Sequence, residues 1–215
     1  MNSVITIGRQ FGSGGREIGM IVAEKFGIKC YDKELLARAA KDSGLCEEVF
    51  VNHDEVPTNS FLYNLVMDTY SFGYNSSAYV DMPVSHKVFL AQFDTIKKLA
   101  DEEPCIIVGR CADYALAERK NLIRIFVSAD EDTKTARIME RFGISESQAR
   151  EMCHKKDKQR KSYYDYYSSK KWGNVNTYDL SVNSSVLGLE GTAELIIQYV
   201  NDVELARARA EEENM

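Results

Sequence analysis

The sequence lacks the features that mark membrane proteins, secreted disulfide scaffolds and zinc proteins. It contains no run of about 18 apolar residues, so no segment is long enough to cross a bilayer as a helix. Its five cysteines are scattered without a C-x-x-C pair, and its 215 residues include only three histidines. We therefore expect buried or inert thiols and no zinc site. A strand pattern begins at the fourth residue with no signal peptide before it, which predicts a cytoplasmic protein without a membrane partner.

An excess of positive charge is also missing, because the formal net charge is −6. This balance argues against nucleic acid as a partner. The charge is uneven, however: between Arg150 and Lys171, eight basic residues stand against three acidic ones, a local charge of +5. Such a basic segment in an acidic protein indicates capture of a small polyanion, with a solvated helix face as the alternative.

The most informative segment is a glycine-rich stretch near the start of the chain. The apolar run Val4–Ile7 predicts a buried strand, and Ile18, Ile21, Val22 and Phe26 recur behind it at helical spacing. Between strand and helix, residues without a Cβ let consecutive backbone N–H groups turn toward one phosphate, where the helix dipole adds positive potential. The residues expected to hold nucleotide phosphates are Gly12, Ser13, Gly14, Gly15, Arg16 and Glu17.

The stretch departs from the P-loop pattern, which requires a lysine for the phosphates and a following hydroxyl for magnesium. Gly15 stands at the lysine position, and the hydroxyl is missing. Arg16 is the nearest cation, and we expect it to replace the lysine. One alternative is a tight turn without a ligand. Another is a dinucleotide fold with Asp32 as the ribose-binding acid, but the third glycine of G-x-G-x-x-G is absent.

Strand and helix signals alternate along the chain, which is typical of a doubly wound α/β fold. The expected parallel strands are 4–7, 28–31, 105–108, 122–127 and 178–182, with helices on both faces of the sheet. Residues 1–215 are interpreted as one domain. Residues 46–85 predict a helical insertion, and a capping box at Ser145 begins a helix that leads into a basic lid over residues 145–171.

These motifs resemble the cytidylate kinase-like family of P-loop nucleoside monophosphate kinases over nearly the whole chain. The resemblance rests on Val4–Ile18, on Cys30-Tyr31-Asp32, on Ile106–Arg110 with its Gly-Arg ending, on Ile125–Arg141 and on His154–Arg160. It implies a P-loop kinase fold, ATP and Mg²⁺ as cofactors, and small-molecule nucleotides as partners. The departures include Val108 and Cys111, which stand where the family has acidic residues.

The resemblance also assigns roles to individual residues. Arg110 is implied to grip the phosphate of the acceptor, with Asp32 and Asp113 beside it. Arg137 and Arg160 are implied to close on the transferring phosphoryl group, with Lys155 and Lys158 as helpers in the lid. Together with Arg16, these two arginines are the expected catalytic residues. The metal ligands are left unassigned among candidates such as Glu17.

The function implied by the resemblance is transfer of a phosphoryl group from ATP to a nucleoside monophosphate, with CMP or dCMP as the expected acceptor. Two alternatives stay open at this point, because the glycine stretch departs from the P-loop pattern. One is a nucleotide-binding module with little or no turnover, and the other is a kinase of another small acceptor. A homo-oligomer is also left open.

Overall fold

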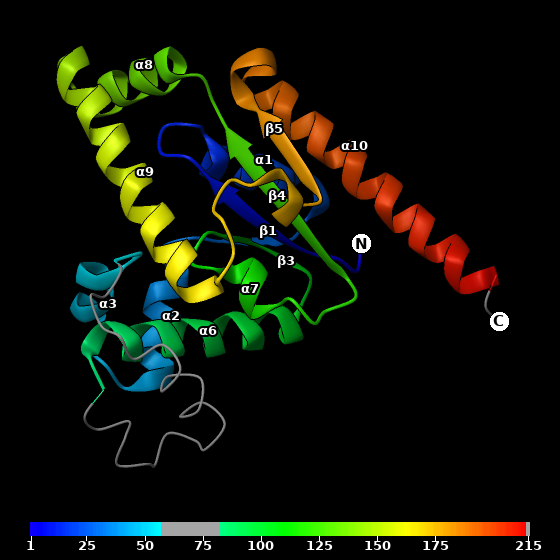
Figure 1. Ribbon diagram of the computed structural model, residues 1–215. Helices are drawn as coiled ribbons and strands as arrows, with labels where there is room; N and C mark the ends of the chain where they lie inside the picture. Colours follow the sequence, from blue (N-terminus) through cyan, green and yellow to red (C-terminus); the bar gives the residue numbers. More distant parts are fainter. Residues whose placement is uncertain (57–81, 214–215) are drawn as a thin grey trace.

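The sheet consists of five parallel strands in the order β2-β3-β1-β4-β5 (Figure 1). The computed structural model describes residues 1–56 and 82–213. The strands are β1 (Val4–Arg9), β2 (Lys29–Tyr31), β3 (Cys105–Val108), β4 (Leu122–Ser128) and β5 (Leu180–Asn183). Central β1 and β3 are almost entirely buried because both faces of a parallel sheet are covered. The predicted five-stranded parallel sheet is confirmed.

Helices cover both faces of the sheet, as the alternating pattern predicts. On one face, Ile5, Ile7, Ile106 and Val108 pack against α1 (Gly15–Phe26) and α10 (Ser184–Glu213). Alternate residues such as Ile107 point to the other face. That face is covered by α2 (Glu34–Ser43), α3 (Glu47–His53), α6 (Val84–Glu102) and α7 (Ala112–Ala115). The predicted insertion over residues 46–85 falls mostly on residues 57–81, outside the described residues.

Two further helices, α8 (Glu131–Phe142) and α9 (Glu146–Ser168), follow β4 and pack against each other (Figure 1). The capping box is confirmed by two reciprocal hydrogen bonds. The Gln148 backbone N–H donates to the Ser145 hydroxyl, and the Ser145 backbone N–H donates to the Gln148 side-chain oxygen. The C-terminal half of α9 is core: Tyr163, Tyr164 and Tyr167 are buried. Movement of the expected lid is therefore limited to the part of α9 before these tyrosines.

The last helix bends at Gly188, whose φ of 70° and ψ of −169° are not helical. Beyond the bend, Ala193, Ile196 and Val200 form an apolar stripe and are fully buried. In Figure 1 the end of α10 extends past the sheet. No helix within residues 1–56 and 82–213 is long and apolar enough to cross a membrane.

The cysteines are all free, and Cys105, Cys111 and Cys153 are buried as expected. Burial raises the pKa of the Cys105 thiol to about 12, which keeps it protonated and inert at neutral pH. Cys46 is not buried, because it lies in the turn that precedes α3.

Candidate active site

A cavity of about 900 Å³ opens at the carboxyl edge of the sheet, where parallel α/β sheets bind ligands. Its walls come from the glycine turn, the first turn of α1, the ends of β2 and β3, the residues after α3, and helices α8 and α9. Of the residues predicted for the site, those that line the cavity are Gly12, Gly14, Arg16, Glu17, Asp32, Arg110, Arg137 and Arg160.

The glycine turn presents backbone donors to this cavity. Gly12 and Gly14 adopt left-handed conformations, with φ of 80° and 79°, that glycine adopts without steric cost. No side chain caps the N-terminus of α1. Among the residues that the structure describes, no hydrogen-bond partner is found for the backbone N–H groups of Gly12, Gly14, Gly15, Arg16 and Glu17. Unsatisfied donors at a helix N-terminus form an anion-binding site.

The same turn is held from behind by Arg137. Its Nη1 donates to the carbonyl oxygens of Gly12 and Ser13, at 3.3 and 2.9 Å, and lies 3.0 Å from the Ser184 hydroxyl. Ser13 itself is fully buried, and its hydroxyl donates to the Gln10 carbonyl. Arg137 therefore fixes the carbonyl side of the turn while the N–H groups of Gly12 and Gly14 stay open. The N–H of Ser13 is not among these donors, because it donates to the Gln10 carbonyl at 3.3 Å.

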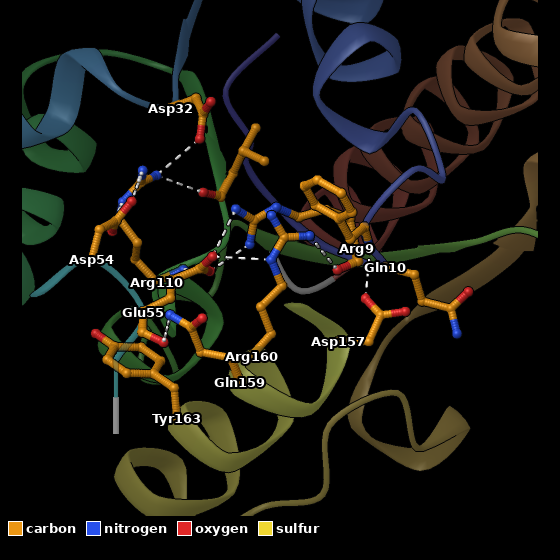
Figure 2. A network of polar contacts seen from close by, with 12 residues as sticks. Arg9, Gln10, Asp32, Asp54, Glu55, Arg110, Asp157, Gln159, Arg160 and Tyr163 are labelled. Atoms are coloured by element: carbon orange, nitrogen blue, oxygen red, sulfur yellow. Dashed lines mark hydrogen bonds and ion pairs between the residues drawn. The ribbon is translucent and has the colours of Figure 1, made fainter. Parts of the chain in front are cut away.

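A network of arginines and carboxylates lies beside the turn (Figure 2). Arg110, at the end of β3, has a side chain only 1% exposed. Its Nε and Nη2 donate to both carboxylate oxygens of Asp54, at 2.8 and 2.9 Å, and its Nη1 lies 3.0 Å from Asp32 Oδ1. Burial alone would lower the pKa of Arg110, but Asp54 and Asp32 outweigh it and hold the guanidinium charged.

The second half of the network centres on Glu55. Arg9 Nη1 and Nη2 lie 2.6 and 3.2 Å from its two carboxylate oxygens, and Arg160 Nε lies 3.1 Å from Oε2 (Figure 2). The backbone N–H of Arg110 also donates to Oε1 at 3.3 Å. Burial would raise the pKa of Glu55, but the two guanidinium groups hold it well below its usual range. This carboxylate is therefore an anion bound by donors from three segments.

Backbone strain is concentrated in this region. Glu55, Arg110 and Cys111 are not glycine, yet they adopt left-handed φ values of 53°, 53° and 55°. Such conformations cost of order 1–3 kcal/mol each and cluster at functional sites. The strain directs the Glu55 and Arg110 side chains into one network, so it supports a functional rather than a purely structural arrangement.

Arg16 joins the network from α1. Its Nε lies 3.0 Å from Asp32 Oδ2 as an ion pair, outside hydrogen-bond geometry, and its side chain is 36% exposed. Asp32 therefore connects Arg16 with Arg110. Glu17 forms a longer pair with Arg141, at 3.4 Å.

Two carboxylates near the start of α1, Glu17 and Asp32, are suited to magnesium, which prefers oxygen ligands. Within the described ranges, no group of three or more acidic, cysteine or histidine side chains could hold a metal ion. Magnesium bound with a nucleotide usually takes only one or two carboxylates, phosphate oxygens and water. The residues present therefore fit an ion that arrives with the nucleotide rather than a resident metal centre.

Besides Ser13 and Gly15, three of the expected residues do not line the cavity. Asp113 is buried behind it in α7, where its carboxylate accepts from the Tyr164 hydroxyl. Lys155 and Lys158 are exposed and point away, because α9 turns Lys156 and Arg160 toward the cavity instead. The sequence analysis missed Arg9, Asp54 and Glu55. The position of Arg9 at a strand end beside the glycine turn could have indicated it, whereas no local motif marks the two acids.

Comparisons with known proteins bear on the family and the fold. Residues 4–186 match the cytidylate kinase-like family. A cytidylate kinase of Archaeoglobus fulgidus is 24% identical over 199 residues, which cover 91% of this chain and 93% of that protein. A crystal structure of an uncharacterized protein from Eubacterium ventriosum has a TM-score of 0.69 and 33% identity, covering 93% of this chain and 98% of that one. A shikimate kinase from Bacteroides thetaiotaomicron, with a TM-score of 0.54, 12% identity and the same coverage, shows the fold alone.

Proposed function

Because the chain belongs to the cytidylate kinase-like family, we propose that it transfers the γ-phosphoryl group of ATP to a nucleoside monophosphate, with CMP or dCMP as acceptor. The family and the fold support a nucleotide kinase. The observation that carries the proposal is the row of unpartnered N–H groups at the start of α1, which faces a cavity lined by arginines. Phosphates need these two kinds of donor.

In the proposed reaction, a phosphate oxygen of the monophosphate attacks the γ-phosphorus of ATP. The bond from that phosphorus to the bridging oxygen breaks, and the products are ADP and a nucleoside diphosphate. The protein supplies position and charge neutralisation rather than a nucleophile. We assign the ATP phosphates to the turn from Gly12 to Glu17. Arg16 and Arg160 are proposed to neutralise the transferring group, and Arg137 to position the turn that binds it. Glu17 and Asp32 would hold, through water, the magnesium that neutralises the phosphate oxygens.

Arg110 is the proposed ligand of the acceptor phosphate. Its guanidinium already binds the Asp54 carboxylate through two parallel contacts, at 2.8 and 2.9 Å, and a phosphate can accept the same pair of donors. Asp32 binds Nη1 of Arg110, so the guanidinium stays oriented while the acceptor phosphate replaces the Asp54 carboxylate. A monophosphate acceptor fits this arrangement better than an uncharged one, since an uncharged acceptor offers nothing in exchange for Asp54.

The test is turnover by the full-length chain with ATP and Mg²⁺ across a panel of nucleoside monophosphates, measured as nucleoside diphosphate formed. We expect the highest kcat/KM with CMP or dCMP. ATP hydrolysis without any acceptor serves as the control. ATP binding without turnover on the whole panel would favour the nucleotide-binding module. Turnover with a different small acceptor would favour a kinase of another small acceptor. The cytoplasmic location and a homo-oligomer stay predictions.

A further inference from the structure

Arg9 occupies the space that a side chain on Gly15 would need. A Cβ atom built on Gly15 would lie 2.6 Å from Arg9 Cβ and 3.2 Å from Arg9 Cγ. Carbon atoms that are not bonded prefer about 3.5–4.0 Å, so both side chains do not fit. Gly15 stands where a P-loop has its phosphate-binding lysine. The Arg9 side chain therefore fills the space that the first atoms of a lysine side chain at position 15 would need.

The other end of the Arg9 side chain reaches β3. A Cβ atom on Gly109 would overlap Nη1 of Arg9 and lie 2.5 Å from its Cζ. Gly109 also has a φ of 78°, so glycine is favoured there on two counts. The side chain thus runs from the first residue of α1 to the end of β3, with a glycine at each end of its path. Its guanidinium lines the cavity.

The guanidinium group of Arg9 binds the carboxylate of Glu55. The carboxylate is bound through two contacts, and Arg160 binds the same group from α9. Without an anion between them the two guanidinium groups would repel each other. A phosphate oxygen pair accepts the same donors as a carboxylate, so the two arginines form a site for an anionic group.

We propose that Arg9, rather than Arg16, supplies the cation that the P-loop lysine supplies elsewhere, and that it contacts the phosphates of ATP beside the turn of Gly12 to Glu17. This inference rests on the proposed function. Arg16 starts one residue later on α1, and its side chain is directed to Asp32 and is partly exposed. Arg9 is 7% exposed and already shares an anion with Arg160. Arg9 is therefore in the more desolvated position, where a charge acts more strongly.

The experiment compares Arg9→Ala, Gly15→Lys and the double variant Arg9→Ala/Gly15→Lys. ATP affinity is measured by calorimetry, and folding is measured by thermal melting. Turnover is measured with the acceptor that the wild-type chain uses best. We expect Arg9→Ala to lower turnover roughly 100- to 1,000-fold, the effect of losing one well-placed donor. Gly15→Lys alone should melt at a lower temperature, because Arg9 fills the space. The turnover of the double variant should be at least tenfold higher than that of Arg9→Ala, since the lysine side chain then has room. Arg119→Ala, outside the cavity, is the matched control.

The outcomes separate this inference from the proposed function. If the wild-type chain neither binds ATP nor uses any acceptor, the proposed function fails first. If the wild type is active and a folded Arg9→Ala variant keeps the wild-type ATP affinity and turnover, the inference is overturned. It is also overturned if Arg16→Ala loses ATP affinity and turnover while Arg9→Ala does not. If Arg9→Ala does not fold, Arg9→Lys replaces it. A loss of tenfold or more with unchanged melting supports the inference, and unchanged turnover overturns it.

Discussion

The carboxylate of Asp157 in α9 accepts a hydrogen bond from the backbone N–H of Phe11, with 2.6 Å between Oδ1 and N. Its other oxygen lies 3.1 Å from Lys134 Nζ in α8. One side chain therefore connects the glycine turn to both helices that follow β4. Any movement of the first half of α9 away from the turn must break or carry along this contact.

Removing that contact should loosen the turn. We expect Asp157→Ala to lower the free energy of unfolding by about 1–3 kcal/mol, since a half-buried N–H loses a charged acceptor. Hydrogen exchange at Phe11 should accelerate. Denaturant unfolding and exchange measured by NMR check both effects. Asp157→Asn keeps an acceptor oxygen and should lose less. Lys155→Ala, on the exposed side of the same helix, is the control and should stay within about 0.5 kcal/mol of wild type. Equal stability of all three variants would contradict the prediction.

Arg110 should be among the least replaceable residues of the site. Arg110→Ala leaves the half-buried carboxylate of Asp54 without its cation and leaves Asp32 with Arg16 as its remaining cation. Breaking a buried ion pair in this way costs about 3–5 kcal/mol. Denaturant unfolding measures the loss. The exposed pair of Arg119 with Asp101 is worth at most about 1 kcal/mol, so Arg119→Ala is the comparison.

The double variant Arg110→Ala/Asp54→Ala separates charge from packing. It should regain part of the stability, because the Asp54 carboxylate that lost its cation is gone as well. No recovery in the double variant would show that packing, not charge, explains the loss. The same proteins also test the proposed acceptor site, since CMP binding should stay weak after the stability has partly recovered.

The sheet could be predicted from the sequence because its strands carry local signals. β3 occupies the predicted residues, since its apolar run is bounded by Pro104 and Gly109. β5 begins two residues later than predicted, at Leu180. Asp179 before it is bound to Arg124, with a backbone bond of 2.8 Å and an ion pair. Such boundary shifts follow from contacts between residues far apart in sequence.

The site was predictable only in part, for the same physical reason. The glycine turn and Arg110 sit in recognisable local motifs, and the structure brings them to one cavity. Glu55 has no motif around it, and its partners Arg9 and Arg160 lie 46 and 105 residues away in the chain. The pairing of the basic segment with distant acids was also beyond local motifs. Within the described residues, Arg150 pairs with Glu131, Asp132 and Glu146, so acidic neighbours compensate part of the +5.

Glu55 should make the protein sensitive to acid. Its pKa is lowered below the ordinary value of 4.5, because Arg9 and Arg160 outweigh the effect of burial. A lowered pKa in the folded state contributes stability that is present above pH 4.5 and is lost as pH falls below it. In Glu55→Gln this contribution is absent. The stability difference between wild type and variant should therefore be constant near neutral pH and shrink below about pH 4.5.

Denaturant unfolding between pH 3 and 7 measures this difference. The other acidic groups with lowered pKa values, such as Asp179 and Glu204, are present in both proteins and cancel in the comparison. Glu118→Gln, which removes an exposed carboxylate, is the matched control. A difference that stays constant down to pH 3 would show that Glu55 is not held ionised by its two arginines.

Nucleotides should protect the first half of α9 more than the second. Lys156, Gln159 and Arg160 line the cavity, whereas Tyr163 and Tyr167 are already buried against α6. With a non-hydrolysable ATP analogue and CMP at saturation, we expect hydrogen exchange to slow over residues 146–160 and in the turn of residues 11–17. Residues 163–168 should be unchanged, because the core there does not open to admit ligand. Exchange measured by mass spectrometry with and without each nucleotide tests this, and Arg160→Ala should remove most of the protection in α9. Uniform slowing along all of α9 would indicate global stabilisation by binding, and no slowing in either half would remove the lid from the mechanism.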